Sequence, residues 1–119
     1  MTSLTFAGMD DVTSVADLLA RTLGLEFEPR SSDYRGGDYF LAGDWRRDDF
    51  PELVYVQPNE DLEEPAEPEY AAYPTLVYVE STLRADQLMQ ALASTDLVLV
   101  RREDWDGLRD SAATPAPSY

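Results

Sequence analysis

The sequence predicts an α+β fold: a single antiparallel or mixed β-sheet of about five to six strands, with two helices on one face. Short apolar or alternating segments, which are typical of strands, occur throughout the chain. Apolar residues at helical spacing occur at only two places. The expected order of elements is β-α-β-β-β-β-α-β. Strands that are segregated in this way from two helices are typical of an α+β domain.

The chain is long enough for one domain with a packed core. It has 119 residues, of which 44% are hydrophobic, and many single domains have about this length. We assign residues 1–110 to a single α+β domain. Residues 111–119 are rich in Ala, Pro and Ser and are expected to form a disordered tail.

The first strand and the first helix are expected near the N-terminus. A short strand is predicted over residues 4–8. Asp10 and Asp11 stand where the N-cap of a helix is expected, and Gly24 stands where a left-handed residue ends it. The apolar residues that recur at helical spacing between them are Val12, Val15, Leu19 and Leu23.

A β-hairpin is predicted between residues 31 and 42. Before it, Leu25–Glu28 is expected to be a brief alternating segment that Pro29 cuts short. Gly36-Gly37 is the expected hairpin turn, because glycines supply the positive φ angles that tight turns need. The spacing of a dinucleotide-binding fingerprint is missing here and no helix follows, so a phosphate-binding loop is not expected.

The tetrapeptide Leu-Val-Tyr-Val occurs twice, as Leu53–Val56 and as Leu76–Val79. In each copy the two valines are expected on one side of a sheet, and the leucine and tyrosine on the other. Neither side is clearly polar, so both faces are expected to be at least partly covered. Two helices cannot cover both faces of such a sheet. The face with Tyr55 and Tyr78 is therefore expected to be left to loops or to a partner.

The second helix and the last strand are predicted after the second copy. Ser81 and Thr82 are expected to cap the helix. Leu97–Val100 is a continuous apolar run, which predicts a central strand that is buried on both faces. The apolar stripe of the helix consists of Ala85, Leu88, Met89 and Leu92.

The connection between the two tetrapeptides, from Gln57 to Pro74, is much longer than the typical about four to six residues. Its prolines favour a stiff, extended backbone. Carboxylates can bind Ca²⁺, but the EF-hand spacing is missing, so no metal is expected. The segment is either a solvated acidic loop or a loop that binds a partner. Its acidic residues are Glu60, Asp61, Glu63, Glu64, Glu67 and Glu69.

The missing residue types exclude many catalytic chemistries. The chain has no Cys and no His, and all of its basic residues are Arg. It therefore lacks a thiol nucleophile, the usual general base, the serine triad, a Schiff-base lysine and a P-loop lysine. Carboxylates alone can hydrolyse glycosides, but among 24 acidic residues a carboxylate pair arises by chance. We therefore predict a non-enzyme without a cofactor.

The net charge of −15, from 24 acidic and 9 basic residues, is the strongest global feature of the sequence. It argues against binding of nucleic acid or of an anionic membrane, because both need a positive surface. No signal peptide or membrane span is visible, and a cytoplasmic location is expected. The charge either maintains solubility or attracts a basic protein partner.

The chain resembles the small acidic immunity proteins of bacterial polymorphic-toxin and contact-dependent inhibition systems. The segments that carry the resemblance are Ser31–Phe40, Leu53–Asn59, the acidic connection and Tyr73–Val79. The resemblance implies that the protein binds a cognate, basic toxin domain and neutralises it by stoichiometric occlusion. Many such toxins are nucleases, whose basic active sites an acidic protein can occupy with carboxylates in place of phosphates.

Two groups of residues are candidates for the partner contact. The acidic connection supplies Asp61, Glu63, Glu64, Glu67, Glu69 and Tyr70, and a second surface supplies Tyr34, Asp38, Tyr39 and Trp45. Solvated charge and core packing are the alternative roles of these side chains. Two other functions stay open: an acidic nucleic-acid mimic that regulates a host or phage enzyme, and a small-ligand-binding α+β domain.

Overall fold

The computed structural model describes residues 1–32, 37–43, 52–59 and 66–104, and these form a sheet covered on one face by helices. Its strands are β1 (Thr2–Gly8), β2 (Glu28–Ser32), β3 (Gly37–Ala42), β4 (Leu53–Pro58), β5 (Thr75–Thr82) and β6 (Val98–Asp104). Its helices are α1 (Val12–Leu23), α2 (Ala85–Leu92) and the short 3₁₀ helix η2 (Pro68–Tyr70).

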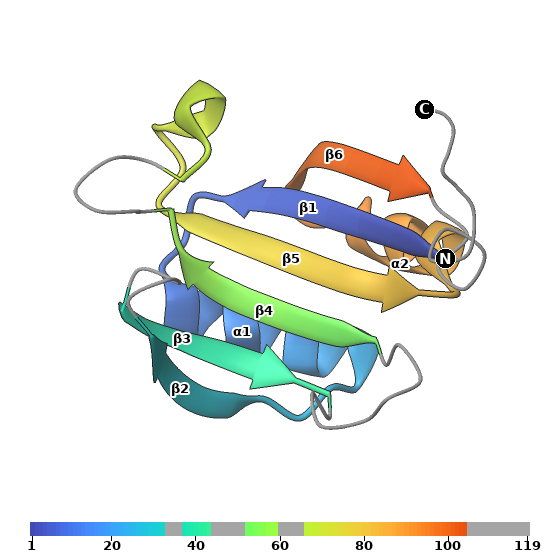
Figure 1. The fold of residues 1–119 in the computed structure, drawn as a ribbon, viewed down its shortest axis with the longest axis horizontal. Coiled ribbons are helices and arrows are strands. Elements are labelled where there is room, and N and C mark those ends of the chain that lie inside the picture. Colours follow the sequence, from blue (N-terminus) through green and yellow to red (C-terminus); the bar gives the residue numbers. More distant parts are fainter. Residues whose placement is uncertain (33–36, 44–51, 60–65, 105–119) are drawn as a thin grey trace, which may run out of the picture.

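All pairs of neighbouring strands are antiparallel, in the order β2-β3-β4-β5-β1-β6. Both α1 and α2 lie behind the sheet in Figure 1, and no helix of the described residues covers the face turned to the viewer. The α+β class, the two helices on one face and the order of elements are confirmed.

The two Leu-Val-Tyr-Val tetrapeptides pair with each other as β4 and β5. Val-Tyr-Val reads the same in both directions, so antiparallel pairing places Tyr55 opposite Tyr78 and each valine opposite a valine. The valines of both strands are at most 2% exposed and face the helices. The predicted sides of these residues are confirmed, because side chains alternate along a strand.

Helix α1 begins and ends where the sequence predicts. The Asp11 carboxylate accepts a hydrogen bond from the Ser14 backbone N–H (2.8 Å), which satisfies a donor at the helix start. Gly24 ends the helix with a φ of 69°. Val15 and Leu19 are buried between the helix and the sheet.

The core lies between the helices and one face of the sheet. Helix α1 packs against β3, β4 and β5, whereas α2 packs against β1 and α1. Thirteen residues form the buried cluster: Leu4, Phe6, Val15, Ala16, Leu19, Ala42, Val54, Val56, Val77, Val79, Ala85, Leu88 and Leu92.

The predicted hairpin is present as β2 and β3, but its first strand lies earlier than expected. Pro29 does not cut the strand short; it lies inside β2, opposite Phe40. An edge strand tolerates proline, because one side of it has no ladder partner that needs the missing N–H. Gly37 has the expected positive φ, at 108°, whereas Gly36 lies outside the described residues.

The prediction that Leu97–Val100 forms a central strand is wrong. Strand β6 lies at the edge of the sheet, and Leu99 is 37% exposed. The central strand buried on both faces is β5, where Leu76 and Val77 are both 0% exposed. An apolar run is typical of a buried strand, but it does not show which strands pair with it, and the place of a strand in the sheet decides how far it is buried.

The predicted cap of α2 is also wrong. Thr82 is the last residue of β5, and Arg84 stands at the N-cap position without a side-chain cap. The Thr82 hydroxyl accepts a hydrogen bond from the Arg84 N–H (3.0 Å) and donates one to Glu52 (2.6 Å). Glu52 also binds the Arg84 guanidinium at 2.7 and 3.0 Å. This cluster joins the start of β4 to the turn before α2.

In the part of the chain that the structure describes, no helix is long and apolar enough to cross a membrane. The expected tail at residues 111–119 lies outside that part.

We predict that Glu52→Gln reduces the pH dependence of stability. Hydrogen bonds from Arg84, opposed in part by burial, lower the pKa of the Glu52 carboxyl. The carboxylate form is therefore favoured in the fold, and its stabilisation is complete above the ordinary pKa and lost as the pH falls through the lowered one. The variant should lose about 1 kcal/mol at pH 7.

Chemical denaturation between pH 7 and pH 3 measures this effect, with Glu26→Gln as a control that removes the same charge from an exposed residue. An equal slope of unfolding free energy against pH in Glu52→Gln and in the control would contradict the assigned role of Glu52.

Candidate partner-binding surface

The face of the sheet that no helix of the described residues covers is the main candidate for partner binding. We call it the open face. Side chains that lie opposite one another form a row across it from β3 to β6: Leu41, Tyr55, Tyr78, Thr5 and Arg101. The row places two tyrosines at its centre and a guanidinium at one end. Figure 1 shows this face toward the viewer.

The tyrosines of β3 and β4 pack against each other on this face. The Tyr39 and Tyr55 rings have their centroids 6.0 Å apart at an interplanar angle of 37°. Tyr39, Tyr55 and Tyr78 are all half-buried. Tyrosine is enriched in protein interfaces because it offers apolar area together with a polar hydroxyl.

The Glu67 side chain contacts residues of the open face. One of its carboxylate oxygens accepts a hydrogen bond from the Tyr78 hydroxyl (3.1 Å), and the other pairs with the Arg101 guanidinium (2.7 Å). The Glu67 side chain is only 15% exposed. Glu67 therefore joins the acidic connection to the sheet, and its charge is largely compensated by Arg101.

Asn59 holds the second half of the acidic connection in place. Its side-chain amide donates to the carbonyls of Tyr70 (2.9 Å) and Tyr73 (3.0 Å). Its side-chain oxygen accepts from the Glu67 N–H (2.8 Å), and its own N–H donates to the Pro74 carbonyl (2.9 Å). The Asn59 contacts and η2 give residues 66–74 a defined fold.

A shallow groove runs along β1 on the open face, and we call it the β1 groove. Its volume is about 400 Å³. Short outward side chains on β1 leave room between the longer ones on β5 and β6. The described residues that line it are Ser3, Leu4, Thr5, Tyr78, Val79, Glu80, Ser81, Arg101 and Glu103.

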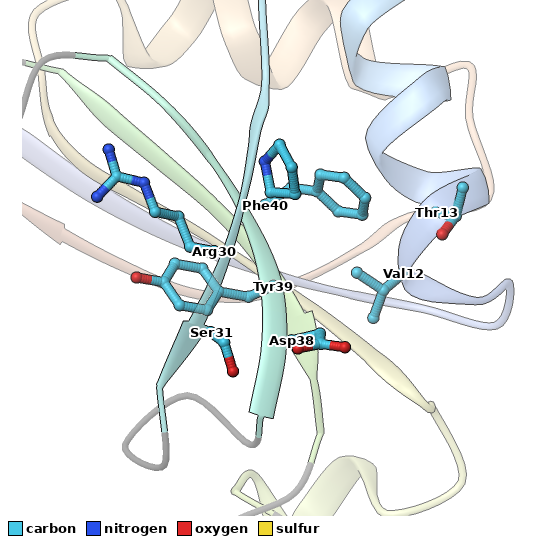
Figure 2. A pocket seen from close by; sticks show the side chains of 8 residues that line it. Val12, Thr13, Arg30, Ser31, Asp38, Tyr39 and Phe40 are labelled. Carbon is cyan, nitrogen blue, oxygen red and sulfur yellow. The ribbon is translucent and has the colours of Figure 1, made fainter.

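A second cavity, of about 540 Å³, lies between the start of α1 and the β2–β3 hairpin, and we call it the hairpin pocket. Figure 2 shows Phe40 and Asp38 on the side of Val12 and Thr13, whereas Arg30 and Tyr39 point to the other side of the strands. On its α1 side the hairpin pocket therefore presents the apolar side chains of Val12 and Phe40 together with one carboxylate, and Tyr39 contributes its side chain to the open face instead.

Five of the predicted contact residues lie in the described part of the chain. Glu69 and Tyr70 belong to η2 and Glu67 is its N-cap residue, and the rings of Tyr70 and Tyr73 are in edge-on contact with centroids 5.8 Å apart. Asp38 and Tyr39 lie on β3 but face opposite sides. The other predicted residues lie outside the described part of the chain: Tyr34, Trp45, Asp61, Glu63 and Glu64.

Sequence reasoning missed Asn59, Glu80, Arg101 and Glu103. Asn59 follows Pro58 at a strand end, where an asparagine that bonds the backbone is common. The other three carry no local signal, because only the pairing of β5, β1 and β6 brings them together.

Among the described residues, no group of three or more His, Cys, Asp or Glu side chains is arranged to hold a metal ion. No protein-family model, curated protein or solved structure matches the chain.

We predict that Asn59→Ala loosens the second half of the acidic connection. The substitution removes three side-chain hydrogen bonds to the backbone of residues 67–73, which should cost about 2 kcal/mol of stability. Hydrogen exchange of the Glu67 and Tyr73 amides should become faster, while that of the core strands changes only with global stability. An unchanged exchange rate at Glu67 would contradict this role.

Proposed function

We propose that this protein is an immunity protein that binds a cognate, basic bacterial toxin and neutralises it by stoichiometric occlusion. The observation that carries the proposal is the combination of a net charge of −15 with a sheet face that no described helix covers and that bears tyrosines and carboxylates.

The charge and the aromatic side chains act at different steps of binding. A strongly negative protein attracts a basic partner over a distance of about 10 Å at moderate salt, which raises the association rate. Half-buried tyrosines lose little conformational freedom when they are covered, and the contacts that they form slow dissociation. Fast capture and slow release are what a stoichiometric inhibitor needs.

A nuclease is the toxin class that suits this surface best. A nuclease cleft is basic because it binds phosphates, so carboxylates can occupy the positions of the phosphates. This inhibition requires an exposed surface rather than an enclosed site with converging catalytic groups. The protein therefore acts as a binding protein and not as an enzyme.

Co-expression tests the proposal directly. The toxin candidate is the product of the neighbouring reading frame, expressed under tight control with and without this protein. We expect that growth is arrested by the candidate alone and restored by co-expression, with a one-to-one complex in size-exclusion chromatography. Absence of rescue would contradict the proposed function. Capture of a host nucleic-acid enzyme instead would favour the nucleic-acid-mimic alternative.

Charge reversal tests the acidic connection within the complex. The triple variant Glu63→Lys, Glu64→Lys, Glu69→Lys should associate with the toxin about tenfold more slowly at low salt. The matched control changes three exposed acids elsewhere: Asp17→Lys, Glu26→Lys and Asp96→Lys. Stopped-flow fluorescence at rising ionic strength measures both rates. Equal rates for the two triple variants would exclude the connection from the contact.

A further inference from the structure

We propose that residues 66–74, which we call the η2 knob, enter a concave site on the basic partner that has apolar walls and a cationic group. This inference rests on the proposed function for the existence of that partner, and it adds which part of the protein is inserted. The β1 groove and the hairpin pocket are hollows, so they suit a projection of the partner and cannot themselves fill its active site.

The η2 knob projects from one end of the sheet. It directly precedes β5, and Figure 1 shows its yellow-green coil at the upper left, beyond the strand ends and apart from both α-helices. Active sites lie in concave clefts. A broad sheet face can cover the mouth of a cleft, whereas a narrow projection can fill it. Occlusion of a cleft therefore favours the η2 knob as the inserted element.

The η2 knob is ordered before it meets a partner. The Asn59 side chain bonds the backbone of the knob on both sides of Pro68, at Glu67 and at Tyr70 and Tyr73. A segment that is already ordered loses less conformational entropy on binding than a flexible loop does. Three backbone N–H groups also donate to carbonyls within the knob: Tyr70 to Glu67 (2.9 Å), Ala71 to Pro68 (3.2 Å) and Tyr73 to Tyr70 (2.9 Å).

The outward side chains of the η2 knob are small and apolar, apart from one carboxylate. Side chains three residues apart in a 3₁₀ helix lie on the same side, so Pro68 and Ala71 share one side of η2 and Glu69 stands on another. These three residues are exposed, whereas Tyr70 is half-buried. Glu69 is the one charged residue of segment 68–74. A matching site therefore has apolar walls and one guanidinium or ammonium group that meets this carboxylate.

A matched pair of alanines allows the insertion to be tested. Ala71 and Ala93 are both exposed, and each is the C-cap residue of a helix, with φ of −58° and −62°. Ala71→Arg adds a bulky cation to the η2 knob, and Ala93→Arg adds the same group at the end of α2. Both variants have the same net charge, so they share the same long-range attraction to a basic partner. Chemical denaturation should give wild-type stability for both.

The affinity of these variants is measured by titration calorimetry with the purified toxin candidate, the product of the neighbouring reading frame. Ala71→Arg should weaken binding at least about hundredfold, because an enclosed basic site has no room for the added side chain and repels its charge. Ala93→Arg should weaken binding less than about twofold. Equal losses for the two variants would overturn the proposal.

Glu69 tests the enclosure from a second side of η2. Glu69→Gln should weaken binding about tenfold. The loss should persist at about 0.5 M salt, because salt screens an ion pair that is shielded from solvent only weakly. The control Glu26→Gln removes the same charge from an exposed residue outside the η2 knob, and its smaller effect should vanish at that salt. If the effect of Glu69→Gln vanishes too, Glu69 only steers the partner, and the inserted contact is overturned.

Asn59 is a positioning residue in this account. In Asn59→Ala the η2 knob becomes ordered only on binding, so the affinity should fall about tenfold. Glu52→Gln, which lowers stability at the Thr82 end of β5, should weaken binding less than about twofold. Hydrogen exchange at the Tyr73 amide of Asn59→Ala should be faster than wild type in the free protein and equal to wild type in the complex. Equal affinities for the two variants would contradict this role of Asn59.

The η2 knob and the immunity function fail in different arms of one experiment. If wild-type protein and Ala71→Arg rescue growth equally and bind the toxin candidate with equal affinity, the knob proposal fails and the immunity function stands. If the wild-type protein does not rescue growth, the proposed function fails, and the knob falls with it as a toxin contact. Rescue by the wild type and by Ala93→Arg, with loss of rescue by Ala71→Arg, is the expected result.

Discussion

The antiparallel pairing of β4 with β5 is the constraint on which the rest of the structure depends. In its observed register, valines lie opposite valines on one face and Tyr55 lies opposite Tyr78 on the other. The valine face is covered by α1 and α2, the two α-helices of the described chain. The tyrosine face carries no helix of the described residues, and its partly exposed side chains include Tyr55, Tyr78 and Glu80.

Arginine serves mainly as an anchor in this acidic protein. In the described part of the chain, Arg84 pairs with Glu52, Arg101 with Glu67, and Arg102 with Asp86 and Asp104. Arginine suits this role because its planar fork binds two carboxylate oxygens at once and does not lose its charge. Because the chain has 24 acidic and only 9 basic residues, one-to-one pairing would leave 15 acids without a basic counterpart. The excess charge is what a basic partner would meet.

The features that depend on neighbouring residues in the chain were predicted correctly from the sequence. The boundaries of α1 follow from Asp11 and Gly24, and the sides of the valines and tyrosines follow from alternation along a strand. These features depend on residues that are close in the chain. The class and order of elements follow from the same local patterns.

Features that depend on which strands pair could not be predicted from the sequence. The apolar run at Leu97–Val100 looks like a central strand, yet β6 lies at the edge. Pro29 looks like a strand breaker, yet the edge position of β2 accommodates it. Glu67 looks like one more solvated acid, yet it binds Tyr78 and Arg101 from two other segments. The groove along β1 arises only when β5, β1 and β6 are side by side.

The measurement that tests the central claim most directly is ¹⁹F NMR of the protein labelled with 3-fluorotyrosine, with and without its toxin. Tyr55 and Tyr78 report on the open face and Tyr73 on the segment beside it, and each signal is assigned by a Tyr→Phe substitution. If the open face is the contact, the Tyr55 and Tyr78 signals shift when the toxin binds. Complex formation with unchanged Tyr55 and Tyr78 signals would contradict the account.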